Sequence, residues 1–193
     1  HTFREFTSAI IKKVERLDKI TTQLINYGRP RELKCEARDV HRNLNQVLHL
    51  AASKSRTQGV RIVRRFDRKL QKIKCDHDLM DQVFTNLVTN ALEAMPKGGV
   101  LTVETRFDED EIRNQAVIMI SDTGYGIPPK VQAQLFKPFF TTKRNGTGLG
   151  LAISHRIIDH HHGAISCASQ TRGARRGTAF TIKLPITPPK ERL

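Results

Sequence analysis

The sequence predicts an α/β fold of the α+β kind, a two-layer sandwich of helices over a mixed β-sheet, with a helical arm at the N-terminus. Three observations support this prediction. Segments with helical periodicity alternate with short segments rich in β-branched residues, as in helices packed on a sheet. The last two short segments follow one another directly, as in a hairpin. A separate amphipathic stripe occupies the start of the chain, before residue 30.

The N-terminal arm is predicted from this stripe, which runs over residues 3–28 in steps of three and four. It is too long to leave in water, so we expect it to pair with other helices. Gly28 and Pro30 end the helix. The apolar residues of the stripe are Phe3, Phe6, Ile10, Val14, Leu17, Ile20, Leu24 and Tyr27.

The elements of the sandwich follow from about Cys35 onward. Helices are marked by apolar periodicity and by Gly or Pro at their ends, and strands by β-branched residues. The tail TPPKERL is expected to be frayed. The predicted elements are a helix at 39–57 ended by Gly59, a strand at 60–66, a helix at 77–95, strands at 100–107 and 115–121, a helix at 148–162, and the strands AISCAS and TAFTIKLP.

Composition narrows the class of protein. The 193 residues suit one compact domain with an appendage. Cys35, Cys75 and Cys167 are widely spaced and form no CxxC pair, which favours reduced thiols in a cytoplasmic setting. The net charge of +14 fits nucleic acid, an acidic membrane surface, an anionic ligand or a phosphorylated partner. Direct nucleic-acid binding is not expected, because the basic residues are scattered and aromatic residues are few.

The helix DHDLMDQVFTNLVTNALEAM carries a polar stripe on a mostly apolar surface. At 100° per residue, Gln82, Asn86, Asn90 and Glu93 fall on one narrow face. One interpretation is a face that simply meets solvent. The other is a divalent ion held by amide oxygen, with the phosphates of a nucleotide as its remaining ligands.

Two glycine-rich turns follow this helix. In SDTGYGIPP, Asp122 ends an apolar strand beside Gly124 and Gly126, which fits a ligand site, an aspartic-protease nucleophile or a plain turn. In NGTGLGLA, Gly146, Gly148 and Gly150 open a helix, and a helix N-terminus attracts phosphate. The second turn matches neither the P-loop nor the dinucleotide fingerprint.

The order of these segments is more specific than any one of them. The Asn-bearing helix, DTGYGI, LFKPFFTTK and GTGLGLA resemble the N, G1, F and G2 boxes of bacterial sensor histidine kinases. That family's ATP-binding catalytic domain belongs to the superfamily shared with gyrase, Hsp90 and MutL. The resemblance covers roughly residues 35–186 and implies a Bergerat-type fold that binds ATP with Mg²⁺. It divides the chain into part of a dimerisation and histidine-phosphotransfer hairpin at 1–30, the catalytic kinase domain at 35–187 and a tail at 188–193.

The resemblance also assigns roles to individual residues. Asp122 would accept a hydrogen bond from the adenine amino group, and Thr178 would lie beside the adenine. Asn90 would bind Mg²⁺, with Asn86 near the phosphates. Phe139 and Phe140, with Phe136, would pack the base of the ATP lid. The residues assigned to the rest of the ATP site are Gly124, Gly126, Ile127, Phe136, Thr141, Thr142, Lys143, Gly146, Thr147, Gly148, Leu149 and Gly150.

Asn86 bears on the reaction. ATPases of the superfamily have a glutamate at the matching position, and an amide cannot act as a general base. The resemblance therefore implies a protein histidine kinase that passes the phosphoryl group on to a response-regulator aspartate. It also implies a homodimer formed through the arm. The alternative is a non-catalytic module of the same fold, gated by nucleotide.

Several features depart from the family pattern. The arm resembles the second helix of the hairpin, so the chain is expected to be a fragment of a longer kinase, compatible with membrane attachment of the parent. His1 is not expected to be the phosphoacceptor, because Glu5 and Phe6 stand where Asn-Pro would follow. His162 replaces a common glycine, and the run of histidines at 160–162 is not expected to bind metal because its side chains diverge. The short lid before Gly146 resembles that of nitrogen-regulatory kinases.

Overall fold

The computed structural model describes residues 32–70, 72–109, 114–143, 146–174 and 176–186, together with Thr7, Ile10, Ile11, Val14 and Thr21. These five residues of the predicted arm are helical, and Ile10 and Val14 are 56% and 58% exposed. The rest of the arm at 1–30, His1 and the tail at 188–193 lie outside the described residues. Within the described part, no helix combines the length and apolar character needed to cross a membrane.

The predicted mixed sheet is confirmed. Its five strands run in the order β2-β4-β5-β7-β6. β2 is parallel to β4, and every other neighbouring pair is antiparallel. Parallel neighbours need a crossover connection, which a helix between β2 and β4 supplies. The strands are β2 (Val60–Arg65), β4 (Gly99–Asp108), β5 (Gln115–Asp122), β6 (Ala164–Gln170) and β7 (Gly177–Pro185).

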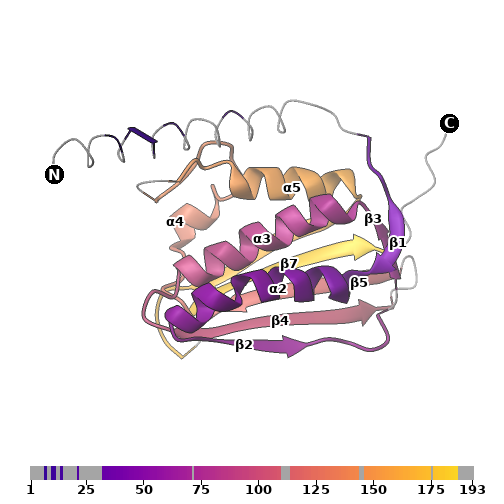
Figure 1. Cartoon of the computed structure of the whole chain (residues 1–193), viewed down its shortest axis with the longest axis horizontal. Helices are drawn as coiled ribbons and strands as arrows, with labels where there is room; N and C mark the ends of the chain where they lie inside the picture. Colours follow the sequence, from indigo (N-terminus) through magenta and orange to yellow (C-terminus); the bar gives the residue numbers. More distant parts are fainter. Residues whose placement is uncertain are drawn as a thin grey trace.

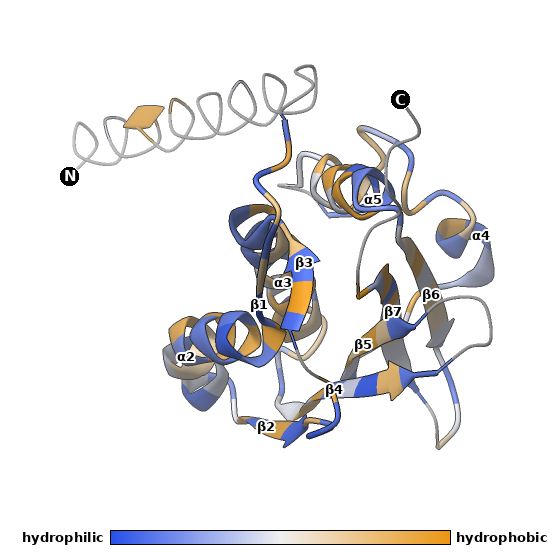
Figure 2. Ribbon diagram, turned by 90° about the vertical axis from the view of Figure 1, so that its right-hand side faces the viewer, coloured by the Kyte–Doolittle hydropathy of each residue, from blue (hydrophilic) through white to orange (hydrophobic). Residues whose placement is uncertain are grey.

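In the described part of the chain, long helices form a second layer over one face of this sheet (Figures 1 and 2). They are α2 (Val40–Thr57), α3 (His77–Glu93) and α5 (Gly150–His160). The core lies between the two layers. Its fully buried side chains include Phe84 and Leu87 of α3 and Ile118 and Ile120 of β5. The central helix α3 is therefore fixed against the sheet, and its remaining polar face is held in a defined position.

Side-chain caps explain where two helices begin. Asp39 accepts a hydrogen bond from the backbone N–H of His41 before α2, and Asp76 accepts one from Leu79 before α3. Helix α2 ends ahead of Gly59, as predicted. The helices predicted at 77–95 and 148–162 are shorter in the structure, at 77–93 and 150–160. The difference lies in the turns at their ends, where propensity says little.

Two features were not predicted. β1 (Glu36–Asp39) pairs with β3 (Lys72–Cys75) in a separate antiparallel sheet beside the helices (Figure 1). These strands are short and are brought together by pairing across a long stretch of chain, which local pattern does not reveal. A one-turn helix, α4 (Pro129–Gln132), follows the glycine turn after β5.

Candidate functional site

Asp122 lies at the end of β5, where burial and hydrogen bonding hold its carboxylate in place. It is buried, and its Oδ1 accepts a hydrogen bond of 2.8 Å from the backbone N–H of Gly124. The partner strand β7 brings Thr178 opposite Asp122, and the Thr178 backbone N–H also donates to the carboxylate. Burial raises the pKa of Asp122, against the effect of these two donors. Asp122 and Thr178 are thus neighbours, as the adenine assignment requires.

Ser169 of β6 links the turn that follows Asp122 to the start of β7. The sequence did not point to this residue. Its hydroxyl donates to the Gly177 carbonyl at 2.7 Å and accepts from the Ile127 N–H at 2.8 Å. The Thr178 Oγ1 lies 2.9 Å from the same oxygen. Because the Ser169 proton points to a carbonyl, Thr178 donates its own proton to Ser169. The lone pairs of Thr178 are then left to accept from a ligand.

Gln132 of α4 extends this network. Its side-chain amide donates to the Ile127 carbonyl at 2.7 Å and to the Ser169 carbonyl at 3.0 Å. Gly126 has a φ of 72°, and a Cβ on it would clash with the Gln170 carbonyl oxygen. The turn after Asp122 can therefore pack on the end of β6 only with glycine at this position.

The polar stripe of α3 separates into two parts in the structure. Gln82 is exposed to solvent, which fits the simpler interpretation of the stripe. Asn86 and Asn90 are half-buried and linked. The Asn86 Nδ2 donates to the Ser154 hydroxyl at 2.9 Å, and that hydroxyl donates to the Gly150 carbonyl at 3.0 Å. The Asn90 Nδ2 donates to the Asn86 Oδ1 at 3.4 Å.

The hydrogen bonds from Asn90 to Asn86 and from Asn86 to Ser154 orient the Asn90 side chain so that its oxygen faces a cation. The Lys143 ammonium lies 2.6 Å from the Asn90 Oδ1 and 2.5 Å from the Glu93 Oε2. An ammonium only donates, so the atom of Asn90 that faces it is the oxygen. Amide and carboxylate oxygens are suitable ligands for magnesium. Asn90 and Glu93 are therefore suitable residues for the implied Mg²⁺ ion, and the Lys143 ammonium occupies the position of a cation between them.

The start of α5 offers backbone donors beside these side chains. In the described structure no side chain caps this helix, so its first N–H groups can bind an anion. Leu149 is fully buried in the core, so it could contact phosphate only through its backbone. Gly148 has a φ of 70°, and a Cβ on it would clash with the backbone of Phe139. The lid segment and the start of α5 are thus joined backbone to backbone.

The aromatic residues before the lid do not all pack as expected. Phe136 is half-buried and its ring contacts His155 of α5, with 5.2 Å between centroids. Phe139 is instead 60% exposed, with a φ of 65°. Its backbone lies against Gly148, and its exposed ring does not provide the packing that was expected of it.

The predicted lid residues gather around Lys143. The Thr141 hydroxyl accepts from the Lys143 N–H at 3.1 Å, and the Lys143 carbonyl accepts from the Gly146 N–H at 3.1 Å. The Thr147 hydroxyl accepts from the Leu149 N–H at 3.4 Å. Thr142 is exposed. Because Lys143 also contacts Asn90 and Glu93, the segment lies beside the last turn of α3.

Helix α3 is the element on which the predicted segments meet. The turn after Asp122 reaches it through a Tyr125 N–H bond of 3.2 Å to the Ala94 carbonyl. Lys143 reaches its last turn at Asn90, and α5 reaches it at Asn86 through Ser154. Residues from three separate stretches of sequence therefore border the C-terminal half of α3.

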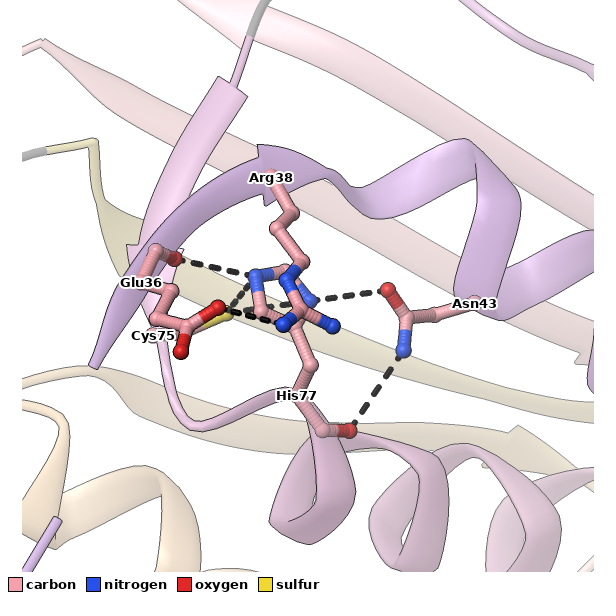
Figure 3. Close-up of polar contacts among 5 residues, drawn as sticks. All are labelled: Glu36, Arg38, Asn43, Cys75 and His77. Carbon is pink, nitrogen blue, oxygen red and sulfur yellow. Dashed lines mark hydrogen bonds and ion pairs between the residues drawn. The ribbon is translucent and has the colours of Figure 1, made fainter. Parts of the chain in front are cut away.

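A second polar cluster lies at the other end of α3 (Figure 3). The His77 ring contacts the Asn43 Oδ1 at 2.8 Å, the Glu36 carbonyl at 3.0 Å and the Cys75 Sγ at 3.7 Å. A thiol, imidazole and amide resemble a nucleophile group. However, Cys75 is buried, and burial raises its pKa to about 12, so the thiolate is unavailable. Arg38 pairs with Glu36 at the surface. The cluster ties β1 and α2 to α3.

The histidine run at the end of α5 does not converge. His161 is buried, whereas His160 and His162 are exposed. Among the described residues, no group of three or more His, Cys, Asp or Glu is arranged to hold a metal ion. A metal at Asn90 would therefore need further ligands from a bound molecule.

Comparison with known proteins agrees with this geometry. Residues 75–188 match the family model described as histidine kinase-, DNA gyrase B- and HSP90-like ATPase. The chain is 35% identical over 185 residues to the signal transduction histidine-protein kinase AtoS of Escherichia coli, covering 96% of the chain and 29% of AtoS. It thus spans less than a third of that relative.

Solved structures give the same result. The nucleotide-free catalytic domain of histidine kinase ThkA matches with a TM-score of 0.71 and 29% identity, over 80% of this chain and 97% of that one. Histidine kinase ThkA in complex with the response regulator protein TrrA matches with a TM-score of 0.79 and 26% identity, over 100% of this chain and 53% of that one.

Proposed function

Because this chain belongs to the histidine kinase-, DNA gyrase B- and HSP90-like ATPase family, we propose that it is the catalytic domain of a sensor histidine kinase. In this role it binds ATP and transfers the γ-phosphoryl group to a histidine side chain. The observation that carries the proposal is the Asn90 oxygen, aimed at a cation beside the uncapped start of α5. Mg²⁺ and phosphate would meet at this point.

Adenine recognition is assigned to the other end of the site. The Asp122 carboxylate would accept from the adenine amino group, and the lone pairs of Thr178, oriented by Ser169, would accept from the base or a bridging water. Both groups are buried, so a base that offered no donor would leave their remaining acceptor positions unfilled, at a cost of about 1–3 kcal/mol.

The polar residues at the phosphates favour transfer to histidine over hydrolysis. In the transfer, an imidazole nitrogen forms a bond to the γ-phosphorus while the bond to the β–γ bridging oxygen breaks and ADP leaves. A neutral imidazole attacks with a lone pair and needs no base, whereas water needs one. Asn86 donates to Ser154 and cannot take up a proton. Mg²⁺ held by Asn90 would neutralise charge on the phosphate oxygens.

The partners proposed for the longer protein follow from its relatives. ThkA matches this chain in a complex with a response regulator, which supports a regulator aspartate as the next acceptor. Pairing of two copies through the predicted arm at 1–30, a cytoplasmic location and a lid of the nitrogen-regulatory kind stay predictions.

Phosphoryl transfer to a supplied hairpin tests the proposal. The chain is incubated with Mg²⁺, ATP labelled in the γ-phosphoryl group, and a separately expressed dimerisation hairpin of the parent kinase that carries its phosphoacceptor histidine. With the unmodified chain we expect acid-labile label on the hairpin. With the Asn90→Ala variant we expect none. ATP binding without label on the hairpin would instead identify a nucleotide-gated module. Acid-labile label on the chain itself, lost in His1→Ala, would make His1 the acceptor.

A further inference from the structure

The contact between Lys143 and α3 brings together groups that are far apart in the sequence. Lys143 is 53 residues from Asn90 and 50 residues from Glu93. Its ammonium lies within 2.6 Å of an oxygen of each. The side chains of Lys143 and Glu93 are 41% and 40% exposed, so ions and nucleotide can reach both.

Glu93 and Asn90 act on the same point in space. They are three residues apart on α3, so they lie one above the other on one face. The relay through Asn86 and Ser154 fixes which atom Asn90 presents. One neutral and one anionic oxygen therefore converge where the ammonium lies. Without a bound cation, the Glu93 carboxylate would repel a triphosphate. A divalent ion could bind the carboxylate and the phosphate oxygens at once.

We propose that Glu93 is a second protein ligand of the divalent ion that accompanies ATP, and that Lys143 holds this position before nucleotide binds. This inference rests on the proposed function, because it concerns the same nucleotide site. Its consequence is that Glu93 makes ATP binding dependent on metal. With metal, the carboxylate is a ligand; without metal, it opposes the phosphates. When the metal ion binds, it displaces the Lys143 ammonium, which can then contact the phosphate oxygens.

Calorimetry of ATP binding in Mg²⁺ and in EDTA tests the role of Glu93. The quantity compared is the dissociation constant for ATP in EDTA divided by the dissociation constant in Mg²⁺. In Glu93→Gln we expect this ratio to fall about tenfold, because binding weakens in Mg²⁺ and strengthens in EDTA. Glu104→Gln is the matched control, since Glu104 is also a partly exposed carboxylate paired with a cation, Arg65. It should leave the ratio unchanged.

Binding of Mn²⁺ alone tests the role of Lys143. In Lys143→Met, paramagnetic resonance should show Mn²⁺ binding several-fold more tightly than in the unmodified chain, because the competing ammonium is gone. The double variant Lys143→Met, Glu93→Gln should lose this gain. Unchanged Mn²⁺ affinity in Lys143→Met would contradict the exchange of cations.

The outcomes separate this inference from the proposed function. If the unmodified chain binds ATP but Glu93→Gln alters both dissociation constants equally, Glu93 is no metal ligand and the inference fails alone. If the unmodified chain binds no ATP in either condition, the proposed function fails and the inference fails with it.

Discussion

The hydroxyl of Ser169 controls the direction of a neighbouring hydroxyl at the proposed adenine site. It accepts from Ile127 and Thr178 while its own proton is committed to the Gly177 carbonyl. Ser169 is thus a positioning residue, which acts on a ligand only through Thr178. Its partners lie eight to 42 residues away along the chain.

Ser169→Ala should have two measurable effects. Loss of the hydroxyl leaves the Gly177 carbonyl and the Ile127 N–H without their partner, which should lower the free energy of unfolding by about 1–3 kcal/mol. The Thr178 hydroxyl also becomes free to turn, so calorimetric discrimination of ATP from GTP should narrow about tenfold, or ~1.4 kcal/mol. Ser169→Thr, which keeps a hydroxyl, should restore discrimination.

Ser166→Ala on the same strand is the control, because Ser166 is exposed. If Ser169→Ala is less stable but still discriminates ATP from GTP as the unmodified chain does, Ser169 contributes to stability alone and does not position Thr178.

The sequence could identify some of these residues and not others. Asp122 and Asn90 stand in motifs that are continuous along the chain. The role of Ser169 and the link between Glu93 and Lys143 depend on contacts between residues up to 42 and 50 positions apart, and no periodicity reveals them. Phe139 was expected to pack because it resembles an aromatic residue of the F box, but its φ is 65°, its backbone lies against Gly148 and its ring is exposed.

At the scale of elements, the end of α5 holds a histidine in a backbone conformation that favours glycine. His162 has a φ of 56°, in the left-handed region that favours glycine. The N–H groups of His162 and Gly163 donate to the carbonyls of Asp159 and Ile158 and so close the helix. The side chain of His162 is exposed and strains the backbone without packing in return.

His162→Gly should therefore stabilise the protein. Relief of the left-handed conformation favours the folded state by roughly 1–2 kcal/mol, and the greater freedom of glycine when unfolded offsets part of this. We expect a net gain of about 0.5–1 kcal/mol in urea unfolding. His160→Gly, within the last turn of α5, should destabilise by up to about 1 kcal/mol. Destabilisation by both changes would refute the strain at His162.

His161 joins the end of α5 to the start of α3. Its Nδ1 donates to the Ile157 carbonyl at 2.7 Å, and its Nε2 accepts from the Asp76 N–H at 3.0 Å. The ring is therefore neutral, and burial lowers its pKa, with His160 and His162 acting in the same direction and Asp76 opposing them. Protonation would remove the acceptor from a buried N–H.

This linkage predicts loss of stability in acid. Below the unfolded pKa of about 6.5 the unfolded chain takes up a proton that folded His161 refuses, so stability falls by at most about 1.4 kcal/mol per pH unit. His161→Gln removes this contribution. The difference in unfolding free energy between the unmodified chain and His161→Gln should be largest above pH 7 and shrink towards pH 5.5. A constant difference would contradict the neutral ring.

At the scale of the whole molecule, the sandwich follows from patterns that the sequence displays openly. The helices and the five strands of the main sheet have clear periodicity, and their order predicted a mixed sheet. The sheet of β1 and β3 escaped prediction because each strand has four residues and pairs with a strand 33 to 39 residues away. Local pattern can thus identify the two layers but not the short elements that close their end.

The central claim is that this fold holds ATP beside the last turn of α3, through Asp122 for the adenine and through Asn90 with a metal ion for the phosphates. Calorimetry of ATP with Mg²⁺ on the unmodified chain and on Asp122→Asn tests it most directly. The amide of the variant presents a donor to the adenine amino group, so affinity should fall ten- to a hundredfold, about 1–3 kcal/mol. Asp108→Asn, at the far end of the strand paired with β5, should bind as the unmodified chain does. Equal affinity of the unmodified chain and a folded Asp122→Asn would contradict the claim.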